Sequence, residues 1–197
     1  MGPRFPDSVA PLGRRVVAFF LDGLVLVPIW VVYGLVLDAT LGPLVASSPD
    51  GAGLVVVAVD APRVALELAL TLLTDATYYA GCWVRWGMTP GQRICGVAVR
   101  VAGSPAPPAT GGVRPPLPGP GPVPAQVATM RWAVLQILPI CAGSLGAAGA
   151  LSFGIVAGIT TGWSGFLLIS AAADPMRRAF HDRVAGTVVV RPAARRP

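Results

Sequence analysis

Residues 132–173 read WAVLQILPICAGSLGAAGALSFGIVAGITTGWSGFLLISAAA and contain no charged side chain. A helix needs about 20 apolar residues to cross the hydrocarbon core of a bilayer, so this stretch most economically holds two spans. We expect a tight turn between them at 152–154; the alternative is one span followed by a re-entrant segment. Small residues recur at every fourth position, a spacing that lets helix backbones approach closely, although codon bias toward Gly and Ala would also produce it. These residues are Ala142, Gly146, Ala150, Gly154, Gly158 and Gly162.

The composition of the whole chain also indicates an integral membrane protein. Of its 197 residues, 54% are hydrophobic and 12% are charged, whereas soluble domains carry about 25% charged residues. The net charge of +6 arises from arginines that flank apolar runs, so membrane topology explains them better than a nucleic-acid partner. Cys82, Cys95 and Cys141 show no metal-ligand spacing, and no cofactor or metal site is expected.

Two further spans precede the uncharged stretch. Residues 16–37 are interrupted by a single charge, Asp22, and are too long for a signal peptide. Residues 63–84 are mainly apolar but include Glu67 and Asp75. The chain is therefore predicted to be an all-α integral membrane protein with four transmembrane helices.

The segments outside the spans are polar or rich in proline. The loop between the first two spans has acidic but no basic residues, and its apolar piece, Leu54–Val59, is too short to cross and is expected to lie against the membrane surface. The proline-rich segment before the third span is expected to be a disordered linker. The chain is thus divided into an N-terminal segment, a helix pair with a following strand, the linker, a second helix pair and an Arg-rich tail, at 1–15, 16–101, 102–126, 127–173 and 174–197.

The distribution of arginines sets the expected orientation. With four spans, fourteen of the fifteen arginines lie on one side of the membrane, and the positive-inside rule makes that side cytoplasmic. Both termini are then cytoplasmic in a bacterial inner membrane. Three spans would place the Arg-rich tail outside, against the rule.

Carboxylates inside the predicted spans are candidate functional groups. Asp22 lies about 10 Å from the cytoplasmic end of its helix at 1.5 Å per residue, so it is expected to face the bundle interior. Glu67, Thr71 and Asp75 form one polar stripe at four-residue spacing. Antiparallel neighbours would bring Asp22 and Asp75 close together, where they would carry a proton or hold a small cation. The alternatives are a structural tie for Asp22, interhelical hydrogen bonds for the stripe and a surface-reaching side chain for Glu67.

Three local motifs occur in order along the chain. They are PLGRRVVAFFLDGLVL at 11–26, GMTPGQRICGVAVRV at 87–101 and AFHDRVAGTVVVR at 179–191. This combination resembles the RDD family of small membrane proteins, which is named for one Arg and two Asp.

The resemblance implies roles for particular residues. The namesake arginine is similar in position to Arg15, with Arg14 as the adjacent candidate, and the two aspartates to Asp22 and Asp182. Transport is the usual suggestion for the family, and sodium–proton exchange has been proposed for some members. The long proline-rich insert departs from the family pattern but leaves the three motifs intact.

Two segments of the sequence echo each other. Residues 93–100 and 183–191 both read R-x-x-G followed by valines and an arginine, and each follows a pair of spans. Arg15 precedes the first of these segments, and Arg131 the second, by a similar number of residues once the outer loop is left out of the count. This pattern indicates a degenerate 2+2 repeat with both halves in the same orientation, or a chance similarity of Val-rich strands.

The same two segments predict a small sheet on the cytoplasmic face. Val97–Val101 and Thr187–Arg191 are rich in β-branched residues, and each follows a glycine. Pairing them as a two-stranded sheet would satisfy their backbone groups and bring Arg93 near residues 181–183, where Asp182 would pair with Arg93 or another arginine. Independent loops lying on the membrane are the alternative.

The favoured function is transport-related exchange of ions or small solutes, with protons or monovalent cations as partners of the carboxylates. The alternative is an accessory or assembly protein that binds a partner or anionic lipid. No nucleophile, metalloprotease or P-loop motif is present, so the chain is not expected to be an enzyme. Four helices are few for a complete transport path, so a homo-oligomer is expected. The candidate functional residues are Arg15, Asp22, Glu67, Asp75, Arg93, His181, Asp182 and Arg183.

Overall fold

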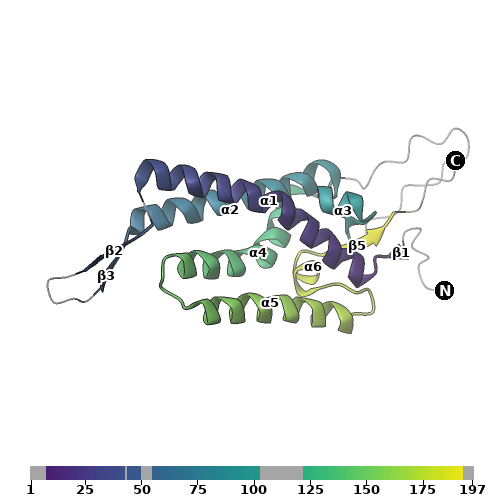
Figure 1. The fold of residues 1–197 in the computed structure, drawn as a ribbon. Coiled ribbons are helices and arrows are strands. Elements are labelled where there is room, and N and C mark those ends of the chain that lie inside the picture. The colour runs from purple at the N-terminus through teal and green to yellow at the C-terminus, as the bar shows by residue number, and fades with distance from the viewer. Residues whose placement is uncertain (1–7, 43, 50–54, 103–121, 193–197) are drawn as a thin grey trace, which may run out of the picture.

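The computed structural model of the chain describes residues 8–42, 44–49, 55–102 and 122–192. Four long helices dominate this part of the chain. Their bounds are α1 Leu12–Leu41, α2 Ala61–Trp86, α4 Ala125–Ala147 and α5 Phe153–Ala173. Figure 1 shows α1 and α2 lying over α4 and α5, with a β-hairpin projecting from one end of these layers and the short helices gathered at the other.

Among the described residues, three of the helices are long and apolar enough to cross a membrane: α1, α4 and α5. The predicted span 16–37 lies within α1, and the uncharged stretch divides into α4 and α5 as expected. The turn between them lies at 148–152 rather than at the predicted 152–154, because Phe153 and Gly154 already belong to α5. Ser152 caps α5 by accepting a hydrogen bond from the Ile155 N–H, which gives the turn between these helices a local cause. The predicted span 63–84 lies within α2, a helix of 26 residues that is not among the three.

The contact between α4 and α5 tests the small-residue spacing. A Cβ added at Gly146 would lie 2.6 Å from Val156 Cγ2, so this glycine permits the close approach of the two helices. A Cβ at Gly154, Gly158 or Gly162 would meet nothing within 4 Å. Close approach through a small residue is therefore confined to Gly146 among these four positions.

The sheet at the end of the helices has three strands rather than the predicted two. β5, Thr187–Arg191, lies between β4, Ala98–Val101, and β1, Ser8–Val9. The expected pairing of the two Val-rich segments is present and antiparallel, running from Ala98 opposite Val190 to Val101 opposite Thr187. The N-terminal strand is too short to show a pattern in sequence, but it pairs with the other edge of β5 and satisfies the backbone groups there.

The outer loop forms a second, two-stranded sheet. β2, Val45–Pro49, pairs antiparallel with β3, Val55–Val59. The apolar piece at 54–59, expected to lie alone against the membrane surface, therefore belongs largely to a hairpin whose strands satisfy one another. The proline-rich linker lies mostly outside the described residues. Its end is ordered, because Val123 is buried and its N–H donates to the Trp83 carbonyl at 3.1 Å.

Apart from the β2–β3 hairpin between α1 and α2, the two halves of the chain repeat the same order of elements. In each, two long helices lead into a short helix, α3 Pro90–Ile94 or α6 Phe180–Val184, and then into a paired strand. Gly96 and Gly186 stand at the corresponding turns with φ of 63° and 64°, a conformation that favours glycine. The packing of the halves is unequal, however, because α2 packs along α4 whereas α1 and α5 touch only locally.

Candidate functional site

Asp22 ties the first short helix to α1. Its side chain is 1% exposed. Oδ1 accepts hydrogen bonds from the Tyr78 hydroxyl at 2.7 Å and the Gly91 N–H at 2.8 Å, and Oδ2 accepts one from the Thr89 hydroxyl at 2.6 Å. Thr89 also caps α3 in a reciprocal capping box with Gln92. Asp22 therefore has the geometry of a structural tie, with both oxygens occupied.

Asp75 has a different set of partners. It is also 1% exposed, and its Oδ2 accepts a hydrogen bond from the Trp132 indole N–H at 2.7 Å. Its Oδ1 is buried and has no hydrogen-bond partner among the described residues. Asp22 and Asp75 are thus held by separate donors: the first by α2 and α3, the second by α4.

The rest of the polar stripe links α2 to α1. The Thr71 hydroxyl hydrogen-bonds to the Tyr33 hydroxyl and also donates to the Glu67 carbonyl at 2.8 Å. Near the hairpin end, the buried Arg63 forms an ion pair with Asp38. Thr71 of the stripe therefore forms an interhelical hydrogen bond, as one of the predicted alternatives requires. The Glu67 side chain is half-buried.

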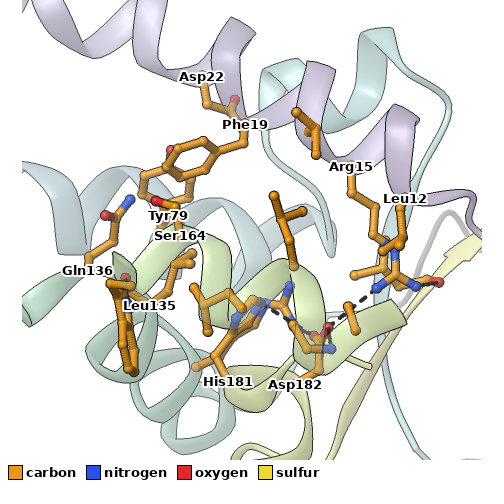
Figure 2. Close-up of a pocket in the computed structure, with 18 of the residues that line it drawn as sticks. Leu12, Arg15, Phe19, Asp22, Tyr79, Leu135, Gln136, Ser164, His181 and Asp182 are labelled. Carbon is orange, nitrogen blue, oxygen red and sulfur yellow. Dashed lines mark hydrogen bonds and ion pairs between the residues drawn. The ribbon is translucent and has the colours of Figure 1, made fainter. Parts of the chain in front are cut away.

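Asp182 lies at the centre of a second buried cluster. It forms ion pairs with Arg131 and, at 3.5 Å, with Arg15, and it is 1% exposed. It also accepts hydrogen bonds from the Thr187 hydroxyl at 3.1 Å and the Ala179 N–H at 3.2 Å. Figure 2 shows Arg15, His181 and Asp182 converging from α1 and α6.

The arginine partners of Asp182 differ in part from the expectation. Arg93 is exposed and forms no ion pair with Asp182 in the described part of the chain. Arg183 is exposed as well. The reason is that α6 packs against α4, which carries Arg131. Asp182 therefore pairs with another arginine, Arg131, which was the stated alternative to Arg93. Arg15 of α1 also pairs with Asp182 and donates a hydrogen bond to the Val189 carbonyl at 3.0 Å.

His181 is buried beside this cluster. Its Nε2 lies 3.8 Å from an Asp182 oxygen. Burial, followed by the positive charges of Arg131 and Arg15, lowers the pKa of His181 well below its ordinary value. The imidazole is therefore neutral near pH 7. The described residues contain no group of three side chains that could hold a metal ion.

A cavity of about 400 Å³ joins these features. It lies between α1, α4 and α5 and ends against α6 and β5 (Figure 2). Most of its wall is apolar, while its polar lining includes Arg15, Asp22, Arg131, His181 and Asp182. This volume falls within the range of small-molecule sites.

The sequence profile described as the RDD family matches residues 9–186, which is most of the chain. The chain belongs to the RDD family. Comparisons with curated proteins and with solved structures each found no match. In this RDD protein, Arg15 and the second motif aspartate, Asp182, contact each other, whereas Asp22 serves a separate junction.

Sequence reasoning assigned no site role to Arg131 or Trp132. The repeat pattern gives Arg131 a position in the second half that matches that of Arg15 in the first, but it predicts no contact for Arg131. In the structure, both arginines bind Asp182. That correspondence was the available signal, whereas the Trp132–Asp75 hydrogen bond depends on how α2 and α4 face each other and has no local signal.

Proposed function

We propose that α2 is a fourth membrane span, with the three-stranded sheet and both termini on the cytoplasmic side of a bacterial inner membrane. At 1.5 Å per residue its 26 residues extend about 39 Å, enough to cross. Its most buried charged groups have partners: Arg63 pairs with the exposed Asp38 near the hairpin end of the helix, and Asp75 hydrogen-bonds to Trp132 inside the bundle. The distribution of arginines supports this orientation.

The proposed function is transport-related exchange of protons or monovalent cations through this helix bundle. The observation that carries it is the free oxygen of Asp75, a buried carboxylate within the helix layers whose Oδ1 has no described partner. A carboxylate inside a membrane is a functional candidate by default, and Asp75 has an acceptor available for a proton or cation. Asp22 lacks that freedom because three donors occupy it.

Ion flux in proteoliposomes tests this proposal. Asp75→Asn keeps an acceptor for the Trp132 N–H but cannot ionise, so it should abolish flux while the protein remains folded. Glu67→Gln, on the same helix face but only half-buried, is the matched control and should retain most of the flux. Asp22→Asn should impair flux more than Glu67→Gln, accompanied by a loss of stability. Wild-type flux in Asp75→Asn would refute the carboxylate path.

The accessory function remains the rival proposal. It is distinguished by the same experiment, because a protein without ion flux in any variant would point to partner or lipid binding. The proposal includes no enzymatic activity and no nucleic-acid partner. A homo-oligomer is proposed because four helices enclose little space for a path, and mass measurement of the detergent-solubilised protein tests it.

A further inference from the structure

We propose that the cavity between α1, α4 and α5 binds one phospholipid with an anionic head group, the head group contacting Arg131 and Arg15 and an acyl chain filling the apolar part. The proposal is independent of the ion path through Asp75, which does not line the cavity. It concerns a site separate from the linker and the Arg-rich tail.

At the end of the cavity near α6, buried polar atoms lack hydrogen-bond partners among the described residues. Arg131 is 3% exposed. Its Nε, the Nε of Arg15 and the Nδ1 of His181 are buried without hydrogen-bond partners among the described residues. All three side chains line the cavity. An unpartnered buried guanidinium N–H carries a free-energy cost, and a small rotation of the Arg131 or Arg15 side chain toward an acceptor in the cavity would remove it.

The charge at this end favours an anion. Arg15 and Arg131 contribute two positive charges, Asp182 contributes one negative charge, and the neighbouring His181 is neutral near pH 7. Asp22 also lines the cavity and adds a second negative charge to its wall, but its oxygens bind donors of α2 and α3, and the described residues show no ion pair between Asp22 and either arginine. The cluster of Arg15, Arg131 and Asp182 by itself therefore carries one positive charge in excess, and burying such a charge is costly.

The exposed residues at the mouth of the cavity indicate that the ligand enters from the lipid bilayer. The exposed lining residues are Phe19, Phe20, Leu168 and Ser164, of which three are apolar and none is charged. A water-soluble anion would have to pass this apolar rim, whereas an acyl chain would bury it. Basic pockets between membrane helices on the cytoplasmic side are suited to anionic head groups. The combination of an apolar wall and a cationic end therefore fits an anionic phospholipid better than free phosphate.

Native mass spectrometry of the purified full chain tests the assignment. Phosphatidylglycerol and phosphatidylcholine with identical acyl chains are titrated separately, and the ratio of their dissociation constants is measured. Both lipids carry a phosphate, but the choline ammonium of phosphatidylcholine would bring a positive charge toward the two arginines, so we expect phosphatidylglycerol to bind about tenfold more tightly or better. Excess inorganic phosphate should leave phosphatidylglycerol bound, and its displacement would reject the lipid assignment in favour of a free anion.

Two substitutions separate charge recognition from structural damage. Arg131→Gln and Asp182→Asn break the same ion pair, so a merely structural effect would move both in the same direction. If the cluster recognises charge, Arg131→Gln should abolish the preference for phosphatidylglycerol while Asp182→Asn should increase it. Arg85→Gln, which alters an exposed arginine outside the cavity lining, is the matched control and should leave the preference unchanged.

A steric variant decides the question if either charge variant fails to fold. Ser164→Trp narrows the mouth of the cavity and leaves the ion pairs intact, so it should weaken binding of both lipids. Unchanged lipid binding in Ser164→Trp, or loss of the preference in both charge variants, would overturn the proposal.

Discussion

Replacing Gly91 with alanine should release α3 from α1. A Cβ at this position would lie 2.3 Å from the Ala18 carbonyl oxygen and 2.8 Å from Asp22 Oδ1, both too short for real contacts. Because the first of these atoms belongs to the backbone, α3 itself must move. That movement also lengthens the 2.8 Å hydrogen bond from the Gly91 N–H to Asp22.

The magnitude follows from these two effects. Overpacking costs about 1–3 kcal/mol, and weakening a hydrogen bond to a buried carboxylate costs about 1–3 kcal/mol. The expected destabilisation is therefore about 2–6 kcal/mol. At about 2–4 °C per kcal/mol for a chain of this size, Tm should fall by about 4–24 °C.

Thermal unfolding in detergent, followed by tryptophan fluorescence, measures this effect. Trp83 is a suitable reporter because its indole N–H donates to Gln92 of α3 at 3.0 Å. Gly81→Ala in α2 is the matched control, since a Cβ added at Gly81 would meet no atom within 4 Å. In a helix, alanine is more stable than glycine by about 0.5–1 kcal/mol, so this control should not lose stability. Equal Tm values for Gly91→Ala and Gly81→Ala would refute the docking of α3 through Asp22.

Three further predictions concern the sheet end of the molecule. Asp182→Asn should lower the free energy of unfolding by about 3–5 kcal/mol, because it leaves two arginines without their carboxylate; a chemical-denaturation loss below about 1 kcal/mol, as for a surface pair, would contradict this. Since the pKa of His181 is lower in the folded protein than in the unfolded chain, the unfolded chain takes up more protons as pH falls below about 6.5, and stability should fall with it. Tm measured from about pH 7.5 to about pH 5 should therefore decline less in His181→Gln than in the parent, and parallel curves would exclude this role for His181. In a background without the native cysteines, Cys substitutions at Ala98 and Val190 should cross-link on oxidation more readily than at Ala98 and Val189, because the first pair lies opposite in the antiparallel register; the reverse order would indicate a shifted register.

Local sequence patterns were sufficient to predict most of the secondary structure. Long apolar runs predicted α1, α4 and α5 because crossing a bilayer requires length and hydropathy, which are read residue by residue. Val-rich segments after Gly96 and Gly186 predicted paired strands for the same reason, since alternation and a glycine turn are local properties. The three ordered motifs were also enough to indicate the RDD family.

The partners of the buried charges were decided by tertiary structure. The sequence marked Asp22 and Asp182 as important, but one binds the start of α3 and the other binds arginines of α1 and α4. Which donor faces a carboxylate depends on how each helix is rotated and where the short helices dock. Gly91 is 69 positions from Asp22 and Arg131 is 51 positions from Asp182, so no local sequence pattern predicts these contacts. The cavity arises in the same way, because α1 and α5 diverge while α2 and α4 pack together. Hydropathy determines which segments enter the membrane, whereas side-chain packing between them determines which polar atoms meet.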